Sequence, residues 1–234
     1  MQKYITVFTG GEYPSRESAC RYVVSGAQNY IIAADSGLET AEAFGFSPDL
    51  ILGDMDSIRD KALLNAYPQD RVKTFIQDKD YTDTELALEE ARKICPADSD
   101  DGTTVVLIGG DGGRIDHLLG IYDLFASGLR PDVWVCRQQA LWYMKKGSTF
   151  ALSDLAAGDP VSIARLSSGR QGGSIETNGL QWESPLFRKT GMPSISNRIS
   201  TAFFDRGKPV ELTVTDGAFL LIVPLSAAVT CLRR

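Results

Sequence analysis

The sequence predicts an α/β protein with a parallel-sheet N-terminal domain and a C-terminal all-β sandwich domain. Over the first ~140 residues, short apolar runs alternate with helical stretches, as in a parallel sheet covered by helices on both faces. Beyond about residue 140, helical periodicity disappears and short strand-like runs recur between glycine and polar turns, which is typical of an antiparallel sandwich or small barrel. We place the boundary between residues 138 and 147, with domains at 1–140 and 141–234.

The elements expected in the first domain follow local signals. Strands are expected at the apolar runs that end in turns, at 4–8, 30–34, 50–52, 71–75, 104–108 and 133–136. Helices are expected between polar starts and glycine or turn ends, at 15–24, 38–44, 82–94 and 114–127. The helix at 82–94 has the clearest signature, because Thr82 and Glu85 form a capping box and Ala87, Ala91 and Ile94 lie on one face.

The second domain is expected to contain short strands separated by close turns. The runs lie at 149–152, 160–165, 174–177, 200–204, 210–214 and 218–223. The sequence shows no internal repeat and no low-complexity segment.

Composition limits the classes of function. The 234 residues are 43% apolar, enough for a sizeable core, and the net charge of −6 argues against nucleic acid as the main partner. No run approaches ~18 apolar residues, so no membrane span is expected, and the N-terminus enters a strand rather than a signal peptide. We therefore expect a cytoplasmic protein.

The cysteines and the histidine do not suggest a zinc site. With no CxxC pair, we expect the four cysteines to be small buried apolar residues in a reducing compartment: Cys20, Cys95, Cys136 and Cys231. The single histidine, His117, argues against a Cys/His zinc site.

Three acidic and glycine-rich segments point to a ligand site. They are GDMDS at 53–57, DKDYTD at 78–83 and GGDGGRIDH at 109–117. Ligands of parallel sheets bind beyond the carboxyl ends of the strands, where several of the acidic residues fall: Asp35, Asp54, Asp56, Asp111 and Asp116. Since clustered carboxylates repel one another, we expect a compensating cation, and Mg²⁺ with a polyphosphate fits because hard cations prefer oxygen ligands.

The acidic residues also have structural interpretations. Asp54 and Asp56 can hold a metal if their segment is extended, because alternate residues then point the same way at ~6–7 Å spacing, but turns are rich in Asp as well. Ser57 adds a hydroxyl ligand or ends the turn. A second metal-binding wall is expected near Thr82, from Asp78, Asp80 and Asp83, although a helix dipole also favours Asp83 at a helix start.

The glycine cluster is the more specific signal. Four glycines in five positions, 109–113, permit a concavity of N–H groups suited to phosphate oxygens, followed by the positive end of a helix. Arg114 supplies a cation and Asp116 a carboxylate, while His117 is either functional or structural. In the second domain, Trp182 by itself favours a place in the sandwich core over a binding surface.

Together, GDMDS, DKDYTD and GGRIDH, in this order and spacing, resemble the thiamine pyrophosphokinases. GLQW at 179–182 and SISN at 194–197 resemble that family's thiamine-binding half. The resemblance implies an α/β catalytic domain, a β-sandwich domain and a homodimer with active sites at the subunit interface. It also implies the reaction, in which ATP and thiamine give AMP and thiamine diphosphate with Mg²⁺.

The resemblance also implies roles for individual residues. The acidic metal and pyrophosphate site would comprise Asp54, Asp56, Asp78, Asp80 and Asp83, with the metal on the first four. ATP would be held by Arg114 and the glycines, with neighbouring side chains beside it: Gly110, Gly112, Gly113, Asp116, His117, Ser57 and Thr82. Thiamine would contact Trp182, Ser196 and Asn197, supplied by the partner subunit. The chain departs from the family pattern at Lys79, where Gln is common, and at Arg198, where an acidic residue is frequent.

Two other functions remain open at this point. Asp54 and Asp56 after a strand also resemble the first motif of haloacid-dehalogenase-type phosphatases, in which the first Asp is a nucleophile and no ATP is used. That reading leaves the glycine cluster unexplained. A catalytically inactive thiamine- or nucleotide-binding protein is the third hypothesis, and the full set of carboxylates argues against it.

Overall fold

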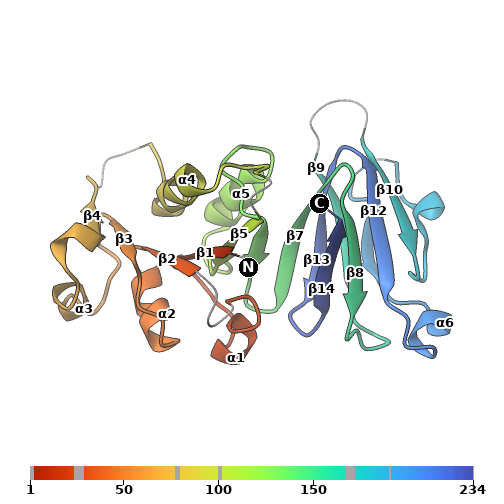
Figure 1. Ribbon diagram of the computed structural model, residues 1–234, viewed down its shortest axis with the longest axis horizontal. Helices are drawn as coiled ribbons and strands as arrows, with labels where there is room; N and C mark the ends of the chain where they lie inside the picture. Colours follow the sequence, from red (N-terminus) through yellow and green to blue (C-terminus); the bar gives the residue numbers. More distant parts are fainter. Residues whose placement is uncertain are drawn as a thin grey trace. The chain divides into compact units, whose positions relative to one another are not determined.

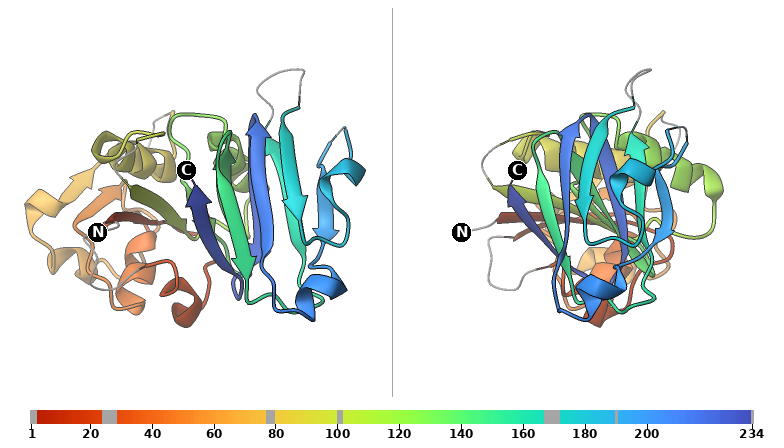
Figure 2. Two further views of the ribbon diagram at one scale, coloured as in Figure 1. Left: turned by 45° about the vertical axis from the view of Figure 1, so that its right-hand side comes forward. Right: turned by 90° about the vertical axis from the view of Figure 1, so that its right-hand side faces the viewer.

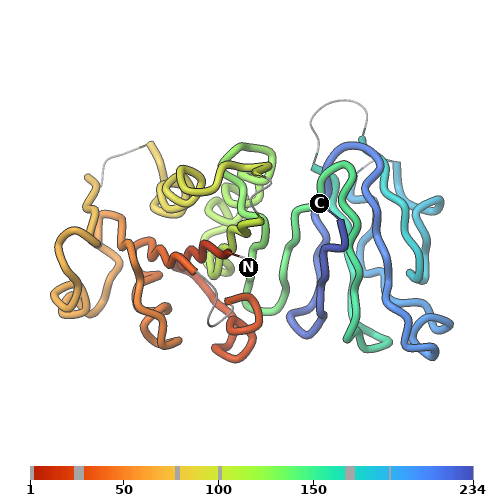
Figure 3. Tube along the Cα trace, in the orientation of Figure 1, coloured from red at the N-terminus to blue at the C-terminus, as the bar shows by residue number. Residues whose placement is uncertain are grey.

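The computed structural model describes residues 3–23, 29–76, 80–99, 102–166, 172–189 and 191–233 (Figure 1). The chain divides into two compact units, Met1–Arg137 and Gln138–Arg234, which Figure 3 shows as a continuous trace. Within the described residues, no helix is long and apolar enough to cross a membrane.

The first unit contains six parallel strands in the order β6-β5-β1-β2-β3-β4. In chain order they are β1 (Lys3–Phe8), β2 (Asn29–Ala34), β3 (Leu50–Gly53), β4 (Val72–Thr74), β5 (Thr103–Ile108) and β6 (Val133–Val135). Every residue of β5 is buried, as expected for an apolar strand covered on both faces.

Helices cover both faces of this sheet. Figure 1 shows α4 (Asp83–Ile94) and α5 (Ile115–Leu124) on one face, and α1 (Arg16–Ala19) and α2 (Gly37–Ala43) on the other. Two short helical segments, α3 (Ala62–Asn65) and η1 (Gln69–Arg71), connect β3 to β4. The predicted capping box is confirmed: Glu85 N donates to Thr82 Oγ1 over 3.2 Å, and Thr82 N donates to Glu85 Oε2 over 2.7 Å.

The helix predicted at 15–24 is much shorter than expected. Ser15 caps its start, but α1 ends at Ala19, and residues 20–23 form turns with Tyr22 and Val23 buried. Residue 24 lies outside the described residues. Tertiary burial of the last two residues has overridden a weak helical propensity.

The strand order places a topological switch point between β1 and β5. The chain builds β2, β3 and β4 outward on one side of β1, and then returns through α4 to place β5 on the other side. The turn at residues 9–11 and the glycine loop at 109–113 follow β1 and β5 directly. A ligand of such a sheet binds outside the carboxyl ends of the strands at this point.

The second unit consists of two sets of antiparallel strands. One set has the order β11-β9-β13-β7 and the other β10-β12-β8-β14, and Figure 2 shows them from two sides. The strands are β7 (Gln139–Lys145), β8 (Thr149–Ser153), β9 (Val161–Leu166), β10 (Ser174–Asn178), β11 (Ser194–Asn197), β12 (Val210–Asp216), β13 (Ala218–Pro224) and β14 (Ala228–Arg233). Side chains from both sets form one apolar cluster, including Phe150, Ile163, Leu212 and Phe219. The coarse prediction of a mixed α/β protein with a second, antiparallel sheet is confirmed.

Some expectations for the second half were wrong. Residues 200–204 were expected to be a strand, but Thr201–Phe204 forms the helix α6, with Phe204 N donating to Ser200 O. A further short helical turn, η2, spans Ser184–Leu186. Two strands, β7 and β14, were not expected. Strand and helix signals are ambiguous in such short apolar runs.

The expectation that all four cysteines are buried is also wrong. Cys95 and Cys136 are buried, whereas Cys20 is exposed and Cys231 is partly exposed, and none of the four forms a disulfide. Burial, with a smaller contribution from Asp111, raises the pKa of the Cys136 thiol. The reactive thiolate is therefore suppressed at this position.

A thiol titration tests this difference. A disulfide reagent such as dithionitrobenzoate should modify Cys20 rapidly in the folded protein and Cys95 and Cys136 only after unfolding. Cys20→Ser should reduce the rapid phase to the contribution of the partly exposed Cys231, and Cys136→Ser should leave the rapid phase unchanged. A rapid phase that disappears with Cys136→Ser would show that this site is open to solvent.

Candidate active site

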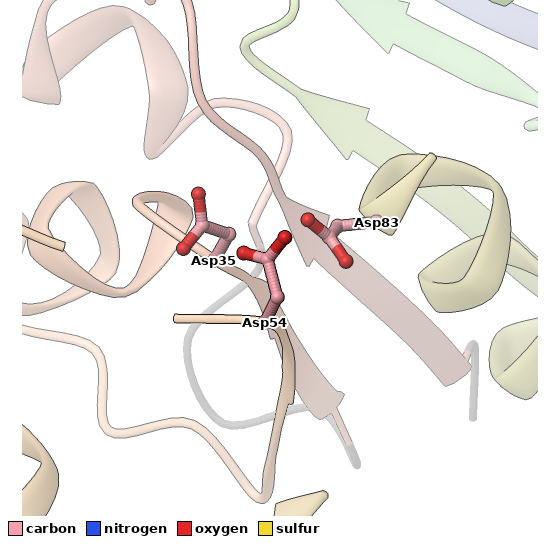
Figure 4. Close-up of side chains that lie close together, drawn as sticks. All are labelled: Asp35, Asp54 and Asp83. Atoms are coloured by element: carbon pink, nitrogen blue, oxygen red, sulfur yellow. The ribbon is translucent and has the colours of Figure 1, made fainter. Parts of the chain in front are cut away.

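Three carboxylates converge at the carboxyl edge of the parallel sheet. Asp35 follows β2, Asp54 follows β3 and Asp83 begins α4; each offers an oxygen, and these oxygens lie within 4.8 Å of one another. Figure 4 shows the three side chains lying close together. Asp35 N donates to Leu52 O over 2.8 Å, so pairing of the strand ends fixes two of the three positions. We call these three residues the carboxylate cluster.

The backbone around the carboxylate cluster is unusual. Gly53 has φ +140°, and a methyl group there would lie 3.2 Å from both Asp35 Cβ and Asp83 Cγ. Asp35 and Met55 adopt left-handed conformations, with φ of 47° and 61°. Each such residue costs about 1–2 kcal/mol, and strain of this kind gathers at functional sites.

The electrostatics of the carboxylate cluster call for a cation. Asp35 is buried, and its Oδ1 has no hydrogen-bond partner among the residues that the structure describes. Burial raises the pKa of Asp35, and the charges of Asp83 and Asp54 raise it further, against hydrogen bonds from Ser57 and the Ser36 amide that lower it. An all-oxygen donor set with an unsatisfied buried oxygen fits Mg²⁺.

Replacing Asp35 tests this account through stability. Because folding raises its pKa, the Asp35 carboxyl favours the folded state at acidic pH, and this contribution is lost as the pH rises through the raised value. Asp35→Asn should therefore make the metal-free protein more stable at neutral pH than the wild type, with a smaller difference in acid. Urea unfolding in a chelator at several pH values measures this. A constant difference between the two proteins at all pH values would contradict it.

The other predicted acidic residues lie differently. Asp56 is exposed, accepts from Ser57 Oγ at 2.9 Å and donates its amide to Asp54 Oδ1 at 3.1 Å. The expectation that Asp54 and Asp56 point the same way assumed an extended segment, whereas the left-handed Met55 makes this segment a turn. Asp80 is exposed ahead of α4. Asp78 and Lys79 lie outside the described residues.

The glycine loop, residues 109–113, requires its glycines for geometric reasons. All four have positive φ, between 64° and 98°. A methyl group at Gly109 would lie 2.5 Å from Thr9 O, and one at Gly110 2.5 Å from Ile121 Cδ1, whereas the space beside Gly113 is open. Gly109 and Gly110 therefore have no room for a side chain, because the loop packs closely there. At Gly113 the backbone faces open space without a side chain to cover it.

The amides of the loop are less available than expected. The N–H of Gly109 donates to Val135 O, that of Gly110 to Gly10 O and that of Gly112 to Asp111 Oδ1. In this conformation, these three groups shape the loop rather than form the expected concavity for phosphate.

An exposed ion pair begins α5. The Arg114 guanidinium donates to the Asp116 carboxylate, at 3.2 Å from Nε and 2.5 Å from Nη2, and this contact lowers the pKa of Asp116 to about 2. Both side chains are largely exposed, as is His117. Exposed pairs contribute little, so Arg114 can exchange Asp116 for another anion at small cost.

The turn at residues 9–11 joins the carboxylate cluster to the glycine loop. Thr9 Oγ1 lies 2.6 Å from Thr84 Oγ1, beside Asp83, and a methyl group at Gly10 would lie 2.5 Å from Ser36 Oγ, beside Asp35. The same turn accepts the Gly110 amide. Carboxylates and glycine loop are therefore neighbours at one edge of the sheet, at the switch point.

In the second unit, Trp182 is surface rather than core. Its side chain is 45% exposed, and the Arg198 guanidinium lies 5.4 Å from its ring centre. Asn197 is fully buried; its Nδ2 donates to Trp182 O over 2.7 Å and its Oδ1 accepts from Trp182 N. Asn197 therefore holds Trp182 in position and does not reach the surface, while Ser196 is exposed with φ 53°.

Comparison with known proteins connects this edge of the sheet to a family. Residues 23–135 match the family model described as thiamin pyrophosphokinase, catalytic domain. This segment is similar to thiamin pyrophosphokinase catalytic domains. It contains the whole carboxylate cluster and the glycine loop, and it confirms the resemblance inferred from the motifs. No curated protein sequence matches the chain significantly.

Solved thiamin pyrophosphokinases share the fold along nearly the whole chain. The protein from Geobacillus thermodenitrificans superposes with a TM-score of 0.67 at 22% identity, covering 94% of this chain and 97% of its own. That from Bacillus subtilis gives 0.69 at 18% identity, covering 94% and 98%. That from Candida albicans gives 0.67 at 15% identity, covering 95% and 89%.

The sequence analysis assigned no role to one residue of the carboxylate cluster. Asp35 was placed at a strand end but given no role, although its Asp-Ser-Gly turn after an apolar run is the same signal that selected Asp54. Asp83, expected in the acidic metal and pyrophosphate site but not as a metal ligand, lies beside Asp54 in the carboxylate cluster, where Asp56 was expected.

Proposed function

We propose that the protein transfers the diphosphoryl group of ATP to thiamine, giving AMP and thiamine diphosphate. The observation that carries the proposal is the meeting of the carboxylate cluster and the glycine loop at the switch point, inside the segment that matches the thiamin pyrophosphokinase catalytic domain. A polyphosphate requires a bound cation and close approach to the backbone, and this edge of the sheet supplies carboxylates that could hold the cation and glycines that leave room for the approach.

The carboxylate cluster would hold Mg²⁺ through Asp35, Asp54 and Asp83. The bound cation would neutralise phosphate charge in the ground state and in the transition state. Asp56, Asp78 and Asp80 remain candidates for further contacts to metal or pyrophosphate, and Ser57 and Thr82 lie in the same two segments.

Arg114 would exchange Asp116 for a phosphate of ATP, with Gly110, Gly112 and Gly113 allowing the nucleotide to approach and His117 beside it. In the reaction, the hydroxyl oxygen of thiamine attacks the β-phosphorus of ATP, the bond from that phosphorus to the bridging oxygen of AMP breaks, and a base takes the hydroxyl proton. Arginine placed on the transferred group stabilises developing charge and contributes several powers of ten in rate in related phosphoryl transfers.

Thiamine carries a permanent positive charge, which an aromatic face attracts. We propose that Trp182 offers this face, with Ser196 beside it and Asn197 holding the Trp182 backbone. The second unit would act as a β-sandwich thiamine-binding domain within a cytoplasmic homodimer whose active sites lie at the subunit interface.

Light scattering tests the homodimer. At micromolar concentration it should give twice the chain mass. A monomer that retains full turnover would contradict the shared site.

Product analysis tests the reaction. The protein mixed with ATP, Mg²⁺ and thiamine should produce AMP and thiamine diphosphate in equal amounts. ADP in place of AMP would refute the proposal. Phosphate release without ATP would favour the phosphatase, and thiamine binding without AMP would favour the inactive binding protein; the comparisons support neither of these.

Replacing Trp182 tests the thiamine contact. Cation–π attraction of about 0.5–2 kcal/mol corresponds to a change of about two- to thirtyfold. Trp182→Ala should raise the KM for thiamine by that factor and leave the KM for ATP unchanged, while Trp182→Phe should have a smaller effect. Equal increases in both KM values would indicate a packing role instead.

A further inference from the structure

A second charged pair lies at the switch point, outside every motif that the sequence singled out. Glu12 follows the turn after β1, Arg137 follows β6, and Arg137 Nη1 lies 2.9 Å from Glu12 Oε2. The Glu12 side chain is 49% exposed, and the Arg137 side chain is 59% exposed. The pair therefore joins the ends of strands on both sides of β5, the strand that carries the glycine loop.

The backbones of both residues are fixed against the glycine loop. Asp111 accepts the Arg137 amide on Oδ2 at 3.2 Å and the Gly112 amide on Oδ1 at 2.8 Å. The Glu12 amide donates to the Asp111 carbonyl over 2.6 Å, and a methyl group at Gly112 would lie 2.5 Å from Glu12 Cγ. The backbone of Arg137 is thus held in place by Asp111, whereas its side chain is largely exposed.

The partner of Arg137 is easily replaced. A solvent-exposed carboxylate–guanidinium pair contributes little, because water screens both charges. A phosphate offers the same guanidinium a bidentate, negatively charged partner, whose geometry arginine matches better than lysine does. A polyphosphate entering at the switch point would meet Arg114 at the start of α5 and Arg137 at the end of β6.

We propose that Arg137 binds the phosphates of the nucleotide, with Glu12 as the anion that occupies Arg137 until the nucleotide arrives. This inference rests on the proposed function, because it assumes that a nucleoside triphosphate is the ligand at this edge. Glu12 is then a competitor of the nucleotide, and Arg137 is a binding residue.

Two substitutions on the same pair separate binding from structure. Arg137→Gln should weaken binding of Mg²⁺–ATP and of inorganic pyrophosphate, measured by calorimetry, by about tenfold, with thiamine binding unchanged. Glu12→Gln should bind both at least as tightly as the wild type, because it removes the competitor. If the pair only supports the loop, both substitutions break the same contact and both weaken binding; this result, or unchanged binding in Arg137→Gln, would overturn the proposal.

Controls separate this inference from the proposed function. Arg71→Gln, an exposed arginine before the amino end of β4, should bind ATP as the wild type does. A wild type that binds ATP but forms no AMP would refute the proposed function and leave the Arg137 comparison decisive. A wild type that forms AMP while Arg137→Gln binds ATP normally would refute only the role of Arg137.

Discussion

Asp54→Asn should reduce AMP formation by at least about a hundred- to a thousandfold while leaving the fold intact. The substitution keeps the shape of the side chain and removes a charged oxygen from the carboxylate cluster, whose function is to hold the cation against the phosphates. Losses of this size are typical when one preorganised electrostatic contact to the transition state is removed. Steady-state AMP production and circular dichroism measure the two quantities.

A matched control uses an acid outside the carboxylate cluster. Asp70 is exposed in η1, before the amino end of β4, so Asp70→Asn should retain full activity. Asp83→Asn should behave as Asp54→Asn does. Wild-type turnover in Asp54→Asn would remove this residue from the cation site.

Arg92→Met should have the opposite profile, with a large loss of stability and normal chemistry. Arg92 is buried in α4, and its guanidinium donates to the Arg130 carbonyl from Nε at 2.8 Å and also from Nη2. It also lies 3.2 Å from Asp132, which in turn accepts the Val105 amide. Losing such a buried network leaves carbonyl and carboxylate oxygens unsatisfied and should cost about 3 kcal/mol.

Urea unfolding measures that loss, and turnover per folded molecule should stay near the wild-type value because the network lies near the amino ends of β5 and β6. Lys93→Met is the control: the neighbouring side chain is exposed and pairs with Glu89 and Glu90, so its replacement should change stability by less than about 0.5 kcal/mol. Equal stability of Arg92→Met and the wild type would mean that solvent reaches these groups.

The parallel-sheet half of the fold was predictable because its signals are local. The strands β1, β2, β3 and β5 are apolar runs that end in glycine or acidic turns, and the capping box of Thr82 and Glu85 marks the start of α4 within three residues. Strand order is not a local property. Asp35 lies near Asp83 because β2 pairs with β3 and because α4 packs over both strands. The spacing of residues along the sequence does not reveal either arrangement.

The second half was less predictable because tertiary contacts decide it. The sequence of α6 is rich in aromatic residues and resembles a strand, and β7 was hidden at an expected boundary. Asn197 belongs to a motif that suggests a ligand contact, yet its burial against the Trp182 backbone gives it a positioning role. Backbone conformation is equally hard to predict from the sequence. The left-handed conformation of Met55 turns the segment, so that the side chains of Asp54 and Asp56 do not point the same way as they would in an extended strand.

Binding of Mn²⁺, followed by electron paramagnetic resonance in the absence of nucleotide, tests most directly whether the three converging carboxylates form one cation site. Asp35→Asn, Asp54→Asn and Asp83→Asn should each weaken binding at least about tenfold relative to the wild type and to Asp70→Asn. Equal binding by all five proteins would contradict the site on which the proposed reaction depends.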